Sequence, residues 1–202
     1  MKKLLVIFLF AVLATFTASA QLPEKAEDIS PLLIGEKIPD VALKATNGSN
    51  QQLHNIFGQK PTVLLFYRGG WCPFCNAHLA EIQEAQNEIL NMGYQIIAVS
   101  PDSPENLQAT DEKQNLAYNL YSDAGGKLTK AIGIAFEAPE RYSGMLSEKS
   151  EGLNKGFLPI PAVFVVDTSG NIEFEYINPD YKTRLSGGML LAVLKELKNQ
   201  KE

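Results

Sequence analysis

The only two cysteines of this 202-residue chain, Cys72 and Cys75, stand three positions apart in the sequence FYRGGWCPFCNAH. A thiolate is a nucleophile, and two thiols at this spacing can cycle between a dithiol and a disulfide. The alternatives are a zinc site and an inert structural disulfide. Zinc needs four ligands, but the other strong candidates are only His54, His78 and carboxylates. A disulfide that closes so short a loop constrains the unfolded chain little. We therefore expect a redox-active pair and no metal.

The segments around the cysteines predict a strand-to-helix turn. Residues 61–67 (PTVLLFY) form an apolar run typical of a buried strand. Apolar residues then recur at helical spacing over residues 75–92, and residues 94–100 (YQIIAVS) predict a second buried strand. Strand, helix and strand form a βαβ unit with parallel pairing. Cys72 should therefore precede the helix, with Pro73 at its first position.

Several residues near this turn are candidates to support the thiols. Free amides of the first helical turn should lower the pKa of Cys72. Trp71 and Phe74 either shield the sulfur atoms or only pack structurally. His78 either favours a thiolate as an imidazolium or, as we expect, is a solvated helix residue. His54 lies in a polar segment without a visible partner.

The remaining segments predict further alternation of helices and strands, and hence an α/β fold in one domain. The expected elements are a helix from the N-cap Ser103 to about Asn115, a strand at 118–121, a brief helix at 127–132, an irregular or partly helical insertion at 136–158, two strands about a turn at 167–171, and a helix at 187–198. The second strand of that pair alternates apolar and acidic residues, which is typical of a half-exposed strand.

The chain resembles the peroxiredoxin-like (AhpC/TSA) branch of the thioredoxin-fold superfamily, over about residues 34–197. IGEKIPDVALKATNGSNQQL is similar to the N-terminal β-hairpin of the family, VLLFYRGGWCPFC to its active-site strand and turn, IIAVSPDSPENLQ to the next strand and helix, and LPIPAVFVVDTSGNI to the strand that carries a cis-proline, here Pro161. The resemblance implies a thioredoxin-like fold, a central mixed β-sheet flanked by helices with an N-terminal β-hairpin extension. It places the domain at residues 34–202, after a linker at 21–33.

The family resemblance leaves two chemistries open. Counted from Tyr67, the peroxidatic cysteine is Cys75, whereas Cys72 and Pro161 stand where peroxiredoxins have a threonine and an arginine. In peroxide reduction, Cys75 is oxidised to a sulfenic acid and Cys72 condenses with it. In a thioredoxin-like disulfide reductase, Cys72 attacks and Cys75 resolves, while a cis-Pro161 leaves backbone groups free to dock an extended partner chain.

Arg68 and Arg184 are the candidates to replace the missing arginine, although both are of a type usually found at the surface. We expect a thiol-dependent antioxidant oxidoreductase that reduces hydroperoxides without a cofactor, using a thioredoxin-like dithiol donor. The alternatives are a protein disulfide reductase and a non-catalytic binding module of the thioredoxin fold.

Residues 1–20 predict a secretory signal peptide, with two lysines, an apolar run at 4–12 and small residues that end at Ala20. The apolar run is shorter than the ~20 residues that span a bilayer. We expect cleavage before Gln21, export to the periplasm or medium, and no stable membrane insertion afterwards. Loss of the two lysines changes the net charge from −5 to −7, which argues against a nucleic-acid partner.

Overall fold

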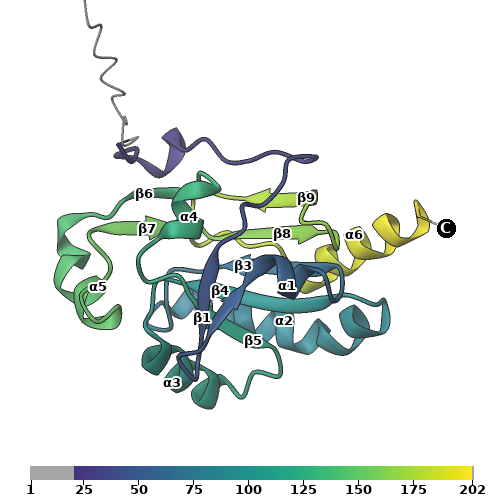
Figure 1. Cartoon of the computed structure of the whole chain (residues 1–202), viewed down its shortest axis with the longest axis horizontal. Helices are drawn as coiled ribbons and strands as arrows, with labels where there is room; N and C mark the ends of the chain where they lie inside the picture. Colours follow the sequence, from purple (N-terminus) through teal and green to yellow (C-terminus); the bar gives the residue numbers. More distant parts are fainter. Residues whose placement is uncertain (1–20, 202) are drawn as a thin grey trace, which may run out of the picture.

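A seven-stranded mixed β-sheet forms the centre of the computed structural model, which describes residues 21–201 (Figure 1). The strand order is β2-β1-β5-β4-β3-β8-β9. Strand β4 pairs in parallel with β3 and β5, and the other neighbours are antiparallel. The strands are β1 (Ala42–Ala45), β2 (Asn50–Gln52), β3 (Thr62–Phe66), β4 (Gln95–Ser100), β5 (Asn119–Ser122), β8 (Ala162–Val166) and β9 (Ile172–Ile177). The predicted βαβ unit and N-terminal hairpin are confirmed.

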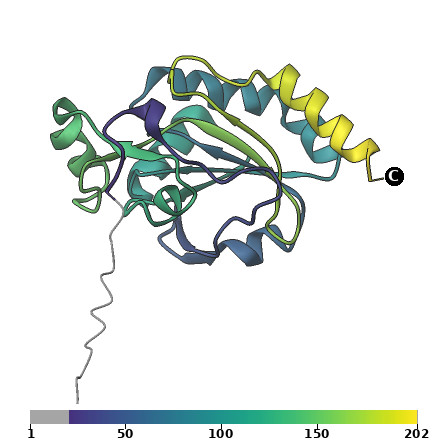
Figure 2. The ribbon, with the colours of Figure 1, turned by 90° about the horizontal axis from the view of Figure 1, so that it is seen from above.

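Helices cover both faces of the sheet (Figure 2). They are α1 (Leu53–Phe57), α2 (Pro73–Asn91), α3 (Pro104–Gln114), α4 (Lys127–Ala131), α5 (Ser143–Lys149) and α6 (Gly187–Asn199), with 3-10 turns η1 (Ala26–Asp28) and η2 (Glu140–Tyr142). Successive side chains of β3 point to opposite faces of the sheet, so the strand contributes to two hydrophobic cores, one on each face. Val63 and Leu65 pack on the face of α2 and α6, while Leu64 and Phe66 pack on the face of α1 and α4.

The insertion between α4 and β8 has more structure than the sequence predicts. It contains β6 (Ala135–Glu137) and β7 (Phe157–Pro159), which pair antiparallel as a separate two-stranded sheet, with η2 and α5 between them. The prediction of a half-exposed strand is confirmed for β9, because every residue of this strand after the buried Ile172 is half-buried. The predicted N-cap is confirmed, since the Ser103 side chain accepts a hydrogen bond from the Asn106 N–H.

Residues 21–33, expected as a linker, lie against the domain. The N–H of Leu32 donates to the Ile132 carbonyl at 3.1 Å, and the N–H of Glu137 donates to the Pro23 carbonyl at 2.8 Å. These bonds fix the segment beside α4 and β6. The signal peptide expected at residues 1–20 lies outside the described residues. Within residues 21–201, no helix combines the length and apolarity needed to cross a membrane.

The chain that follows this segment covers the beginning of the β9 edge. The N–H of Gly35 donates to the Ile172 carbonyl at 2.8 Å, and the Ile172 N–H donates to the Glu36 carbonyl at 2.9 Å. At the opposite end of the sheet, β2 is only three residues long, and all three are polar. Neither edge of the sheet is therefore a long, unprotected apolar strand.

Candidate active site

Both cysteines lie where β3 leads into α2, as predicted. Cys72 is the N-cap of α2, and Pro73 is its first residue. The N–H groups of Cys75 and Asn76 each donate to the Cys72 carbonyl at 3.0 Å. The two cysteines are 2% and 1% exposed and are present as thiols. The helix start thus holds a dithiol within the core cluster of this face of the sheet.

Gly69 and Gly70 allow this turn to approach β4 and α3 closely. Gly69 has φ +139°, and a Cβ there would overlap the Trp71 ring and the Asp102 carboxylate. A Cβ on Gly70 would overlap the Thr110 side chain of α3. The buried Asp102 accepts a hydrogen bond from the Gly70 N–H at 2.7 Å. A side chain at either glycine would therefore displace the turn that presents the thiols.

Sequence reasoning missed Asp102, although its position carried a signal. Asp102 follows the carboxyl end of β4, which is the parallel neighbour of β3, and such ends meet at one edge of a sheet. Burial raises the pKa of Asp102 to about 6, while the hydrogen bond from Gly70 opposes this shift. The carboxyl group anchors the active-site turn from the next strand.

The two thiols have opposite pKa shifts. A hydrogen bond from the Cys75 thiol lowers the pKa of Cys72 to about 6, and the charges of Arg68 and Arg184 act in the same direction. Burial raises the pKa of Cys75 well above the ordinary cysteine value. At neutral pH the pair therefore holds one negative charge, and Cys72 carries most of it.

All three arginines of the chain lie around this turn. A guanidinium N–H of Arg184, from Nη2, donates to Cys75 Sγ at 3.5 Å. Arg68 is only 4% exposed, and its charge acts on Cys72. Arg141 lies on η2, with its guanidinium carbon 4.8 Å from the Tyr142 ring centroid. The expectation that Arg68 is a surface residue is wrong, and Arg184 is half-buried.

His78 is not the solvated residue that we expected. Its side chain is 7% exposed, and Nε2 lies 3.0 Å from the Leu185 carbonyl, to which it donates as a neutral imidazole. Burial lowers the pKa of His78 to about 4, so at neutral pH it supplies no positive charge to a thiolate. One turn further along α2, the Glu81 carboxylate accepts a hydrogen bond from the Gly187 N–H at 2.8 Å. Both residues fix the segment that carries Arg184.

The aromatic neighbours of the thiols differ in burial. Trp71 is half-buried against the core cluster that contains both cysteines, and its ring centroid lies 5.6 Å from that of Tyr142. Phe74 is 42% exposed and meets the edge of Tyr181 at 5.7 Å. Trp71 therefore packs on the core cluster that holds the thiols, whereas Phe74 belongs to the surface. His54, on α1, has a partner after all, because its Nδ1 lies 2.7 Å from the Asp40 carboxylate.

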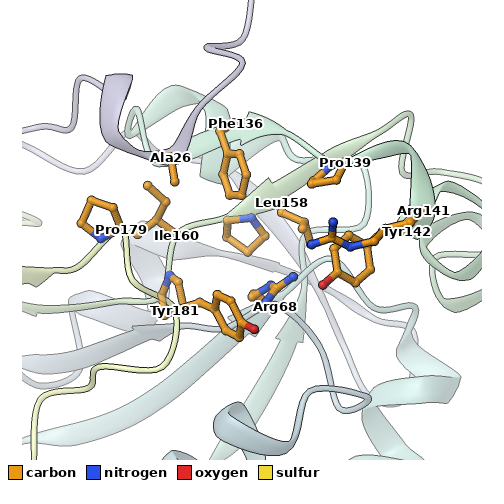
Figure 3. A pocket seen from close by; sticks show the side chains of 12 residues that line it. Ala26, Arg68, Phe136, Pro139, Arg141, Tyr142, Leu158, Ile160, Pro179 and Tyr181 are labelled. Carbon is orange, nitrogen blue, oxygen red and sulfur yellow. The ribbon is translucent and has the colours of Figure 1, made fainter.

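A pocket of about 190 Å³ lies beside Arg68 (Figure 3). Arg68 sits between Tyr142 and Tyr181, with its guanidinium carbon 5.1 Å and 4.4 Å from the two ring centroids. The insertion supplies much of the wall, including Phe136, Arg141 and Leu158. Sequence reasoning missed the pocket residues that the insertion supplies, because the insertion has no periodicity that would place its side chains.

A model of the AhpC/TSA family matches residues 34–175, which is most of the chain and includes both cysteines. The chain belongs to the AhpC/TSA family. It is 24% identical over 168 residues to Peroxiredoxin Bcp of Escherichia coli strain K12, covering 83% of this chain and 99% of that protein. It is 34% identical over 101 residues to Peroxiredoxin Bcp of Bacillus subtilis strain 168, covering 50% and 64% respectively.

Solved structures confirm the thioredoxin-like fold of this AhpC/TSA protein. Reduced Prx3 from Vibrio vulnificus in complex with hydrogen peroxide superposes with a TM-score of 0.69 at 19% identity, covering 81% of this chain and 99% of that one. Peroxidoxin BcpB from Mycobacterium tuberculosis superposes with a TM-score of 0.65 at 20% identity, covering 81% and 97%. With these relatives and this dithiol, the AhpC/TSA chain is a thiol oxidoreductase.

Pro161 departs from the expectation that the family resemblance raised. All peptide bonds of residues 21–201 are trans, so the predicted cis bond before Pro161 is wrong. The trans bond lets the chain run directly from β7 into β8, and the residue before a proline favours such an extended path. The N–H of Ile160 donates to the Ile134 carbonyl at 2.9 Å. This amide is therefore not free to dock an extended partner chain.

The pKa of Cys72 in this AhpC/TSA protein predicts a pH dependence of its alkylation. The thiolate is the reactive form, so the rate at Cys72 should rise with pH about a midpoint near 6. Cys75→Ala removes the hydrogen bond that contributes most, and the midpoint should move towards the ordinary value of 9.0. Cys75→Ser keeps a donor and should shift the midpoint less. Iodoacetamide labelling followed by peptide mass spectrometry measures both sites, and a midpoint near 9.0 in the unmodified protein would contradict this assignment.

No metal centre is found among residues 21–201, where no three His, Cys, Asp or Glu side chains are grouped so that they could hold an ion.

Proposed function

We propose that this protein reduces hydroperoxides through a dithiol/disulfide cycle of Cys72 and Cys75. The observation that carries the proposal is a buried pair of thiols that shares one negative charge beside the guanidinium groups of Arg68 and Arg184. The pair provides a nucleophile, a second thiol that resolves the intermediate, and positive charge where an oxyanion develops. The names of the relatives, which are peroxiredoxins, agree with this reaction.

The oxidative half of the cycle needs no reductant other than the two thiols. A thiolate attacks the terminal oxygen of the hydroperoxide, the O–O bond breaks, and the alkoxide leaves and takes up a proton to become an alcohol. The sulfenic acid on the first cysteine is then attacked by the second thiolate, and water leaves as the disulfide forms. Two electrons from the two thiols thus reduce one hydroperoxide.

The electrostatics favour Cys72 as the first nucleophile, which reverses the order expected from the family register. Only the thiolate attacks, and a pKa of about 6 leaves Cys72 mostly ionised at neutral pH. Cys75 is held as a thiol by burial and donates to Cys72. Once Cys72 is oxidised, it no longer carries the negative charge that opposes ionisation of Cys75. The Arg184 guanidinium, 3.5 Å from Cys75 Sγ, then favours the Cys75 thiolate.

Reduction of protein disulfides is the second candidate, because a thiolate at Cys72 is also what a disulfide reductase needs. The neighbourhood of Pro161 opposes it. The Ile160 N–H is already bonded to Ile134, and the space that the insertion lines beside Pro161 is a pocket of about 190 Å³, which is small for an extended chain.

The electron donor and the location belong to the same proposal. A thioredoxin-like protein dithiol would reduce the disulfide by exchange and restore the resting state. The reaction takes place outside the cytoplasm, in the periplasm or the medium. This part rests on the signal pattern at residues 1–20 and the expected cleavage after Ala20.

Two assays on one preparation test the function. We expect steady-state consumption of an alkyl hydroperoxide in the presence of thioredoxin and thioredoxin reductase, with slow reduction of insulin disulfides by the same enzyme. The Cys72→Ser/Cys75→Ser double variant is the matched control, because it keeps two hydroxyl donors in the turn. Peroxide consumption no faster than that control, together with brisk insulin reduction, would establish the second candidate and overturn the first.

A further inference from the structure

The three arginines of this acidic chain form an unpaired cluster of positive charge. The chain has a net charge of −5, and its fifteen other basic residues are lysines. Among residues 21–201, none of the three arginines forms an ion pair with a carboxylate. The Nε atom of Arg68 is buried without a hydrogen-bond partner. A buried guanidinium without a counter-ion is costly, so this arrangement favours binding of an anion.

Two of these arginines face the same small pocket, from different parts of the chain. Arg68 follows β3, and Arg141 and Tyr142 belong to η2 in the insertion (Figure 3). Both Arg68 and Arg141 lower the pKa of the Tyr142 hydroxyl. A hydrogen bond with Arg68 contributes most to lowering its pKa, and Arg141 adds to the effect. Planar guanidinium groups bind carboxylates in a two-pronged geometry, which makes a carboxylate the anion of choice.

The rest of the lining limits the ligand to a small molecule with an apolar body. Phe136, Leu158, Ile160 and Pro179 supply apolar surface around the two arginines. A dry cavity of about 150 Å³ holds one benzene ring, so a pocket of about 190 Å³ has room for one compact organic group. An extended segment of a protein partner needs more room than this volume provides.

We propose that the pocket binds a small thiol that carries a carboxylate, and that this thiol reduces the Cys72–Cys75 disulfide. The proposal rests on the cycle proposed above and gives it a small-molecule donor in addition to a protein dithiol. The carboxylate pairs with Arg68 and Arg141, and its apolar body lies against the insertion. Arg68 connects the pocket to the disulfide, because it lines the pocket and its guanidinium carbon lies 5.1 Å from the ring centroid of Trp71, the residue before Cys72.

The reducing step is balanced by two molecules of the thiol. The bound thiolate forms a bond to Cys72 Sγ, the Cys72–Cys75 bond breaks, and Cys75 leaves as a thiolate beside the Arg184 guanidinium. Cys75 then takes up a proton. A second thiolate attacks the mixed disulfide on Cys72, which releases the symmetrical small disulfide and regenerates the Cys72 thiolate.

Binding is tested first on the reduced protein, without any redox step. Trp71 is the only tryptophan, and its ring centroid lies 5.6 Å from that of Tyr142, which lines the pocket, so its fluorescence reports on the pocket. We expect benzoate to bind at least about tenfold more tightly than the neutral benzamide, as a charged hydrogen bond implies. Arg141→Gln should remove this preference, whereas Lys155→Gln, which removes an exposed charge from the same insertion, should keep it.

Reduction is tested on the disulfide form, in the absence of peroxide. At equal thiolate concentration, mercaptopropionate should reduce the disulfide about tenfold or more faster than mercaptoethanol, with a rate that saturates. Arg141→Gln should bring the two rates together. Equal binding of benzoate and benzamide, or equal rates with the two thiols in the unmodified protein, overturns the proposal. Neither measurement involves peroxide or thioredoxin. A negative result would therefore overturn the proposed thiol-binding pocket without bearing on peroxide turnover, which tests the proposed function separately.

Discussion

Cys72→Ser is expected to lower the rate of hydroperoxide consumption by at least about 1,000-fold, as loss of an enzyme nucleophile does. A serine hydroxyl does not ionise at neutral pH, so the attack on the O–O bond loses its thiolate. Cys75→Ser should behave differently. It should retain one rapid turnover per molecule, because Cys72 can still attack, and then lose steady-state turnover with thioredoxin because no second thiol forms the disulfide.

Rapid-mixing measurements of peroxide loss, followed by mass spectrometry, distinguish these two variants. Cys75→Ser should accumulate a sulfenic acid on Cys72 after one equivalent of peroxide, and trapping with dimedone marks the site. Cys72→Ser should accumulate none on the same time scale. The opposite pattern, a burst and a sulfenic acid on Cys75 in Cys72→Ser, would show that the order expected from the family register holds and that the charge distribution described here does not determine it.

Arg184→Gln is expected to have the second largest effect, a fall of about 10- to 100-fold in turnover. The Arg184 guanidinium donates to Cys75 Sγ and lowers the pKa of both cysteines. Glutamine keeps hydrogen-bonding capacity but loses the charge. Arg184→Lys should recover part of the rate, since it keeps the charge and loses the planar fork.

The pH profile separates a chemical role of Arg184 from a structural one. In Arg184→Gln, the alkylation midpoint of Cys72 should move upward, because a positive charge that favours its thiolate is gone. Lys182→Gln is the matched control, as it removes an exposed charge from the same loop. An unchanged midpoint in Arg184→Gln, with normal turnover, would exclude Arg184 from the reaction.

The elements that position the cysteines could be predicted because their signals are local. An apolar run followed by helical spacing and a second apolar run defines β3, α2 and β4 within 40 residues of one another. Pro73 marks the helix start, and with it the N-cap position of Cys72. Such signals depend on neighbouring residues only, so a single sequence contains them.

The electrostatics of the site depend on contacts between distant residues, which a single sequence does not show. His78 is buried because Leu185, 107 positions away, packs against α2 and accepts its hydrogen bond. Arg141 and Tyr142 reach the site through an insertion without periodicity, and the trans bond before Pro161 reflects how β7 enters β8. In each case, tertiary packing decides what the residue type alone leaves open.

The two ends of the central sheet bear on self-association. An open strand edge is a template for another chain, and proteins protect such edges with short strands, charges or covering segments. Here residues 35–38 occupy the start of β9, Glu173 and Glu175 lie further along it, and β2 closes the other end with three polar residues. Copies of this protein therefore gain little from joining their sheets edge to edge, which disfavours amyloid-like stacking and directs any dimer contact to other surfaces.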